Sequence, residues 1–238
     1  MHSANSATQG LPDILAKLVG LDYDIPEGGG IRRLFSNVNA DFYAGGLSAI
    51  LGPSGSGKSS LLSVLGGLIG PTSGKVFSDG VELSAMDEEK RCEFRMNKVG
   101  FIFQDIRLLP QLSAFDNIMY PAWFRVRDKR TAIALANEQI AAVGMSHKAT
   151  SMPSTMSGGE RQLIAFARIL TSDPPIVLAD EPTASLDWRA AELLLTTMQN
   201  NVRGKKKAAI IVTHDPRVLD WVDHVYHVEE GKLRYEKR

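Results

Sequence analysis

The chain has 238 residues, of which 44% are hydrophobic and 23% charged, enough for one domain with a substantial core. Lys and Arg total 27, as do Asp and Glu, so the net charge does not point to a nucleic-acid partner, and none is expected. The single cysteine, Cys92, excludes an internal disulfide and is typical of a reducing compartment. The longest apolar run, at 61–69, is shorter than the ~20 residues that span a bilayer. We therefore expect a cytoplasmic protein, with a flexible leader over residues 1–12.

In chain order, the hydrophobic pattern alternates between strands and helices, with one long helical interruption. The predicted strands are apolar runs bounded by turn residues, at 15–23, 35–42, 46–51, 74–78, 99–103, 176–180 and 209–212, before a closing hairpin over 224–235. A charged helix is predicted over 84–97 and another helix over 188–201. Apolar strands alternating with helices predict an α/β fold with a mixed, mainly parallel sheet covered on both faces. A helical lobe over about 105–171 is inserted into it.

A glycine-rich loop follows the predicted strand at 46–51 and leads into a helix. It reads Gly52-Pro53-Ser54-Gly55-Ser56-Gly57-Lys58-Ser59 and matches every position of the phosphate-loop motif. The glycines leave the backbone unobstructed, so successive N–H groups can turn toward the β- and γ-phosphates of ATP at the helix N-terminus. Lys58 supplies a neutralising charge, Ser59 places a hydroxyl on Mg²⁺, and Ser60 lies near the α-phosphate. Many kinases, GTPases and motors share this loop, so it leaves the function open.

Two adjacent carboxylates, Asp180 and Glu181, end the predicted strand at 176–180. Open α/β sheets bind their ligands at the C-terminal edge of the strands. We therefore expect Asp180 to hold Mg²⁺ through water, and Glu181 to orient and deprotonate the attacking water. A pair of helix-capping carboxylates is the alternative, which the phosphate loop in the same chain disfavours.

Gln104 and His214 end two further predicted strands. Gln104 can contact Mg²⁺ or the attacking water while it tethers the helical lobe. His214 can donate a hydrogen bond to the γ-phosphate. A lone histidine is more often structural. Its place at the C-terminal edge of a strand nevertheless favours a catalytic role.

A second Ser-Gly-Gly element, about a hundred residues downstream of the phosphate loop, begins another helix. It consists of Ser157, Gly158, Gly159 and Glu160 after Met156, and leads into the apolar helical run at 163–170. A helix N-terminus presents free N–H groups and favours anions, so the chain carries two predicted phosphate sites. A small-molecule kinase would leave this element and His214 unexplained.

The ordered set of these motifs, together with Ser185-Leu186-Asp187 and Thr213-His214-Asp215, resembles an ABC ATPase nucleotide-binding domain over nearly the whole chain. The resemblance implies one such domain over residues 13–238, with a RecA-like core, an antiparallel β lobe and an α-helical lobe. It implies a homodimer that sandwiches two ATP molecules, in which Ser157 and Gly159 face the partner's γ-phosphate and Asp187 communicates across the dimer. Tyr23 falls where the family stacks an aromatic ring on adenine, with a plain strand residue as the alternative.

Finer similarity lies in Leu65-Gly66-Gly67-Leu68 and in the stretches 71–76, 95–104 and 108–114, which resemble the branch containing LolD, MacB and FtsE. The implied function is the ATP-hydrolysing subunit of a transporter, peripheral on the inner face of the membrane, with integral-membrane permease subunits and a periplasmic partner. A soluble ABC-type ATPase in DNA repair or translation is the alternative, but such proteins usually show long coiled coils or tandem nucleotide domains. In the family, the segment that corresponds to residues 156–160 is called the signature element. Met156 replaces its common Leu, and Leu163 stands where an Arg often follows it.

Apolar side chains are concentrated in the predicted helical lobe. In the family this lobe receives a short cytoplasmic helix of the membrane subunit, and an exposed subset of these residues is expected to form the groove. The candidates are Leu108, Leu109, Leu112, Phe115, Pro121, Trp123 and Phe124.

Overall fold

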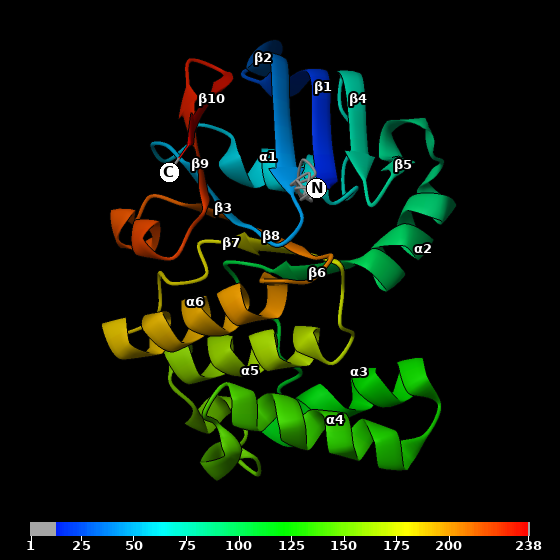
Figure 1. Cartoon of the computed structure of the whole chain (residues 1–238), viewed down its shortest axis with the longest axis vertical. Coiled ribbons are helices and arrows are strands. Elements are labelled where there is room, and N and C mark those ends of the chain that lie inside the picture. Colours follow the sequence, from blue (N-terminus) through cyan, green and yellow to red (C-terminus); the bar gives the residue numbers. More distant parts are fainter. Residues whose placement is uncertain (1–12, 238) are drawn as a thin grey trace, which may run out of the picture.

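The computed structural model describes residues 13–237, so the leader expected over 1–12 lies outside the described residues. The chain forms two β-sheets, with helices between and below them (Figure 1). This is the α/β architecture that the sequence predicts. The separate antiparallel sheet is the β lobe that the family resemblance implies.

The first sheet is antiparallel, with strand order β2-β1-β4-β5. Its strands are β1 (Ile14–Glu27), β2 (Gly30–Tyr43), β4 (Ser73–Ser78) and β5 (Val81–Glu82). Gly28 and Gly29 both have positive φ, as a tight two-residue hairpin turn requires. Pro26 pairs with Ile31 inside the hairpin. The strand tolerates this proline because β4 pairs with β1 only as far as Asp22.

The second sheet has six strands in the order β10-β9-β3-β8-β7-β6. The strands are β3 (Leu47–Leu51), β6 (Val99–Ile102), β7 (Ile176–Asp180), β8 (Ala208–Thr213), β9 (His224–Glu229) and β10 (Lys232–Lys237). All neighbouring pairs are parallel except β9 with β10. Since β3, β6, β7 and β8 run the same way, their C-terminal ends meet at one edge of the sheet.

Alternate residues of the central strands enter two different cores. Ile50, Leu178 and Ile210 pack with helix α1 (Lys58–Leu65) and the antiparallel sheet. Their neighbours in sequence face the helices α5 (Gly158–Leu170) and α6 (Trp188–Val202) on the other side. Burial on both faces explains why these strands are continuously apolar in sequence.

Helices α3 (Ala114–Val126), α4 (Lys129–Ala142) and α5 follow β6 and precede β7, below the six-stranded sheet in Figure 1. The charged helix α2 (Glu88–Lys98) begins four residues later than predicted, because Asp87 caps it by accepting a hydrogen bond from the Lys90 amide at 2.9 Å. Short 3-10 turns complete the fold: η1 (Leu83–Ala85), η2 (Ser146–Lys148), η3 (Pro153–Thr155) and η4 (Pro216–Asp220). Within residues 13–237, no helix has the length and apolar character needed to cross a membrane.

Candidate active site

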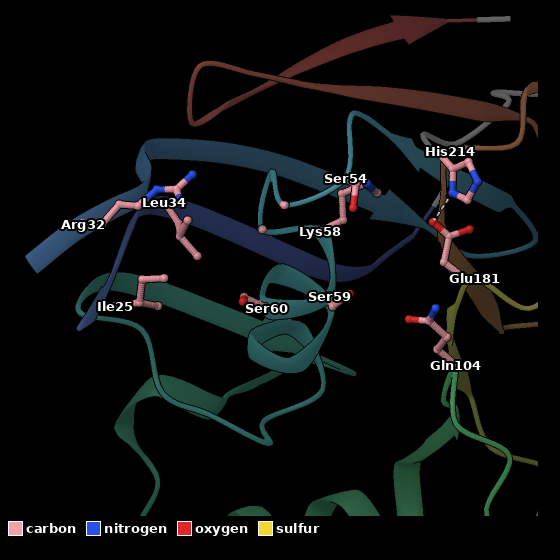
Figure 2. A pocket seen from close by; sticks show the side chains of 12 residues that line it. Ile25, Arg32, Leu34, Ser54, Lys58, Ser59, Ser60, Gln104, Glu181 and His214 are labelled. Carbon is pink, nitrogen blue, oxygen red and sulfur yellow. Dashed lines mark hydrogen bonds and ion pairs between the residues drawn. The ribbon is translucent and has the colours of Figure 1, made fainter. Parts of the chain in front are cut away.

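A pocket of about 660 Å³ lies where the C-terminal ends of β3, β6, β7 and β8 meet (Figure 2). The phosphate loop and α1 form one wall, and residues from three other strand ends face it. The antiparallel sheet contributes a third side. The lining residues are Ile25, Arg32, Leu34, Ser54, Gly55, Gly57, Lys58, Ser59, Ser60, Gln104, Glu181 and His214.

The phosphate loop owes its shape to backbone conformations that favour glycine. Gly55 and Gly57 have φ of 75° and 90°. A Cβ at Gly57 would lie 2.9 Å from the Phe35 ring, so a larger residue would push the loop away from the sheet. Lys58 is largely buried, and its ammonium donates hydrogen bonds of 2.8 Å to the carbonyl oxygens of Gly52 and Pro53. These bonds hold the positive charge against the loop.

Three of the predicted loop residues contribute to the loop without lining the pocket. Gly52, Pro53 and Ser56 do not line the pocket, although all belong to the loop. Gly52 is needed for close packing, because a Cβ there would lie 3.1 Å from both the Ser56 hydroxyl oxygen and the Val228 Cβ. Their contribution is therefore the path of the backbone.

Two of the three predicted metal ligands, Ser59 and Asp180, meet in the structure. The Asp180 carboxylate accepts a hydrogen bond from the Ser59 hydroxyl, and burial raises the pKa of Asp180 above its usual range despite that bond. Among residues 13–237 there is no cluster of three or more His, Cys, Asp or Glu side chains suited to a metal. One carboxylate and one hydroxyl suit Mg²⁺, which binds few protein ligands and completes its shell with water and phosphate oxygens.

Glu181 is held by its backbone and by two side-chain partners. Its φ is 47°, in the left-handed region that non-glycine residues rarely adopt. One carboxylate oxygen accepts a hydrogen bond of 2.7 Å from the Thr213 hydroxyl, and the other lies 2.8 Å from His214 Nδ1 (Figure 2). The Thr213 hydroxyl in turn accepts a hydrogen bond from the Asp215 amide at 3.0 Å. The site thus fixes the position of the carboxylate that the sequence assigns to the attacking water.

Thr213 was not among the predicted site residues. It is fully buried at the end of β8, and its position in the Thr213-His214-Asp215 motif was the available signal. A β-branched residue ending a buried strand is ordinary in sequence, so only the contact with Glu181 distinguishes it.

Gln104 lies exposed after β6 and lines two hollows. One is the pocket just described. The other, of about 450 Å³, lies in the helical part of the chain and is also lined by Asp105, Ile106, Leu108, Pro110, Pro153, Ser154 and Arg161. A ligand or partner in either hollow would touch the segment that carries Gln104.

The second predicted phosphate site lies away from the pocket. Ser157 caps α5, its hydroxyl accepting a hydrogen bond from the Glu160 amide at 3.1 Å while the Glu160 carboxylate accepts one from the Ser157 amide at 2.8 Å. That backbone bond, and then Lys148 at 3.1 Å, lower the pKa of Glu160. None of Ser157, Gly158, Gly159 or Glu160 lines the nucleotide pocket of its own chain.

The signature element packs against the segment that precedes α6. A Cβ at Gly159 would lie 3.1 Å from the Leu186 side chain, and one at Gly158 would lie 3.6 Å from Ser185. Asp187 caps α6 by accepting a hydrogen bond from the Ala190 amide at 2.9 Å. Asp187 does not line the pocket either.

Tyr23 is not brought into the pocket. Its side chain is partly buried against the core beneath the antiparallel sheet. The same hairpin instead contributes Ile25 and Leu34 as apolar lining and Arg32 as a cation (Figure 2). A register shift between Tyr23 and Asp24 separates the two residues' environments, which simple alternation along the strand could not predict.

The fold and the site are those of the ATP-binding cassettes, and comparison with known proteins agrees. The model of the ABC transporter family matches residues 35–184, more than half of the chain. The chain therefore belongs to the ABC transporter ATP-binding family. It is an ATP-hydrolysing subunit of the kind that serves ABC transporters.

Individual relatives support this assignment over nearly the full length. The lipoprotein-releasing system ATP-binding protein LolD of Bordetella pertussis is 39% identical over 94% of this chain and 96% of its own. LolD 1 of Rhodopirellula baltica is 38% identical, over 90% and 93%. The dimeric post-hydrolysis structure of the ATP-binding cassette MJ0796 with ADP and Pi matches with a TM-score of 0.87 and 32% identity, covering 94% of this chain and 98% of that one.

Proposed function

We propose that this chain powers a lipoprotein-releasing transporter from the inner face of the membrane, working as a homodimer with integral-membrane permease subunits and a periplasmic partner. The similarity to two lipoprotein-releasing ATP-binding proteins supports lipoproteins as the cargo. The observation that carries the dimer is the division of the site. The pocket gathers Lys58, Glu181 and His214 but leaves the helix N-terminus at Ser157 outside.

In this proposal some pocket residues neutralise the charge of the phosphates, and others position and activate the attacking water. Lys58 and the loop amides bind the β- and γ-phosphates, and Ser59 and Asp180 hold Mg²⁺, which supplies charge neutralisation at the phosphates when bound. Glu181 accepts a proton from the attacking water while Thr213 keeps its carboxylate in place. His214 and Gln104 contact the γ-phosphate side of the pocket. The partner's Ser157, Gly158 and Gly159 close the site with helix N–H groups.

The permease in this proposal docks near the second hollow. Gln104 borders both this hollow and the nucleotide pocket, so a membrane-subunit helix seated against Leu108 and Pro110 would sense the nucleotide through one residue. This is the helix-in-groove mode of recognition, in which apolar anchors enter a preformed hollow.

The experiment that tests the divided site mixes two inactive variants. One chain carries Ser157→Arg and the other Lys58→Ala, and phosphate release is measured with the permease present. Both defects then fall in one composite site, and the other site is built from unaltered halves. We expect activity well above that of either variant alone.

The control places both substitutions in one chain and pairs it with the unaltered chain. That pairing damages each site once and should be the less active of the two. Equal, background activity of both mixtures, with heterodimers demonstrated, would contradict a partner role for Ser157. Release of a lipoprotein from membranes by the reconstituted complex tests the cargo.

A further inference from the structure

The turn between α3 and α4 carries a concentrated positive charge on a chain whose total charge is balanced. We define the basic tip as residues 123–130, with the sequence Trp-Phe-Arg-Val-Arg-Asp-Lys-Arg. Four cations and one carboxylate give it a net charge of +3 (4 − 1). It lies at the end of the α3–α4 pair, far from the antiparallel sheet (Figure 1).

The cations of the basic tip lack acidic partners. Arg127, Lys129 and Arg130 are exposed, and within residues 13–237 none of them forms an ion pair. The tip's one carboxylate, Asp128, is engaged by its own helix, accepting hydrogen bonds from the Thr131 amide at 2.7 Å and the Thr131 hydroxyl at 2.6 Å. The charges of Arg127, Lys129 and Arg130 therefore face solvent.

Two aromatic rings accompany this charge. Phe124 is 68% exposed and Trp123 37% exposed, and their ring centroids lie 6.0 Å apart in a stacked arrangement. Neither residue lines the nucleotide pocket or the second hollow, of about 450 Å³, in the helical part of the chain. Exposed aromatic rings beside unpaired cations are the combination that binds the interface of an anionic bilayer, where the rings enter the headgroup layer and the cations meet phosphates.

The cations of the basic tip occupy backbone positions that favour other residue types. Arg127 ends α3 with φ 58°, a left-handed conformation that favours glycine. Lys129 and Arg130 occupy the first turn of α4, where the helix dipole favours acidic residues, and no acidic residue is present there. The helix ends themselves therefore do not explain the choice of cations, which favours a role in contact with a partner outside the chain.

We propose that the basic tip binds anionic phospholipid headgroups directly, with Phe124 inserted among them, beside whatever contact the permease makes. The inference rests on the proposed function, which places the chain at a membrane. Arg125 stiffens the tip by donating a hydrogen bond to the Ser172 carbonyl, which ties the end of α3 to the end of α5. A bound bilayer would thus orient the helical lobe relative to the membrane plane.

The test is co-sedimentation of the full chain, without permease, with vesicles of phosphatidylcholine alone or mixed in equal parts with phosphatidylglycerol. We expect binding only to the anionic vesicles, weakened by added salt. Arg127→Gly should weaken it about fivefold, and Lys129→Glu with Arg130→Glu at least roughly thirtyfold. Both variants should melt no lower than the unaltered chain, because each improves the local helix end. Phe124→Ser should weaken the part of the binding that salt does not remove.

The matched control is Lys205→Glu with Lys206→Glu, an equal change of charge at two exposed lysines of another loop. It should leave vesicle binding within twofold. Binding that is absent, or that the control reduces as much as the tip variants, overturns the proposal. So does loss of permease co-purification in detergent by tip variants whose vesicle binding is unchanged, which assigns the tip to the permease. Basal ATPase activity, measured on the same variants, tests the proposed function separately, since vesicle binding does not require hydrolysis.

Discussion

Glu181 stands out among the single residues because its backbone and its side chain are both constrained. A left-handed φ at a residue other than glycine costs roughly 1–2 kcal/mol, so the surrounding structure must stabilise it. The Glu181 amide donates a hydrogen bond of 2.9 Å to the Val212 carbonyl oxygen, and the carboxylate lies between Thr213 and His214. The constraint holds the carboxylate in the position from which it lines the pocket.

We expect Glu181→Gln and Lys58→Ala to fail in different ways. Glu181→Gln keeps the shape of the pocket but cannot accept a proton, so ATP should bind normally while turnover falls about 100- to 10,000-fold. Lys58→Ala removes a cation that meets the phosphates before and during reaction, so nucleotide affinity itself should fall. Titration with a fluorescent ATP analogue and a phosphate-release assay separate the two. An equal loss of affinity in both variants would refute this division.

Thr213 offers a sharper test of how Glu181 is positioned. Thr213→Val preserves shape but removes the hydroxyl that donates to the carboxylate, and we expect kcat to fall roughly tenfold to a hundredfold with little change in KM. Thr213→Ser retains the hydroxyl and should recover most of the activity. If Ser and Val lower kcat alike while both proteins fold, packing of the methyl group and not the hydrogen bond is what matters.

At the scale of the element, the N-terminus of helix α5 carries both a capping box and the predicted second phosphate site. Its Ser157–Glu160 capping box satisfies two amide groups, so the helix starts at a defined residue. Close packing of Gly159 on Leu186 then fixes that start against the segment leading to α6. A partner's phosphate would meet a helix end already ordered by its own chain, which reduces the entropy lost on dimerisation.

The lowered pKa of Glu160 makes the stability of this cap depend on pH. A carboxyl whose folded pKa is depressed adds stability that is present above its unfolded pKa and is lost as pH falls through the folded value. Glu160→Gln should therefore unfold more easily at neutral pH, by about 0.3–1 kcal/mol. The difference from the unaltered chain should vanish in acid. Denaturant melts of both proteins across pH measure it.

Glu138→Gln is the control for that comparison, since Glu138 is exposed within α4 and away from its ends. Its effect on unfolding should be small at every pH. A pH-dependent loss of the same size in both variants would mean that net charge, and not the cap, sets the dependence.

At the scale of the whole molecule, the phosphate loop and the signature element are separated within one chain. The phosphate loop lies on the α1 side of the six-stranded sheet, and α5, whose first residues carry the signature, packs on the other side. In the proposed homodimer a second chain joins them, and ATP between the chains supplies contacts that neither makes alone.

We accordingly expect Glu181→Gln to be largely monomeric without nucleotide and dimeric with Mg-ATP, because ATP that binds only the closed dimer shifts the equilibrium by mass action. Light scattering at several protein concentrations measures the mass. Glu181→Gln combined with Ser157→Arg is the control and should stay monomeric. One unchanged mass with and without nucleotide would count against the shared site.

The sequence by itself determined the features that depend on local order. Strand β7 was predicted to the residue, and the phosphate loop and Asp180-Glu181 were assigned by spacing. Gln104 and His214 were assigned from their place at strand ends, which a parallel sheet brings to one edge. The ABC family and the two-lobed α/β fold followed from the order of these motifs, and comparison with known proteins confirms both.

Only the tertiary structure decided which side chains meet across the fold. It joined Thr213 to Glu181, 32 residues earlier, packed Tyr23 against the core beneath the antiparallel sheet, and set the order of the strands within each sheet. These outcomes depend on strand order and register between distant segments, where a shift of one residue turns a side chain to the opposite face. Hydrophobic period and turn chemistry act over a few neighbouring residues, so they specify where a strand lies in the chain but not which strand it will pair with.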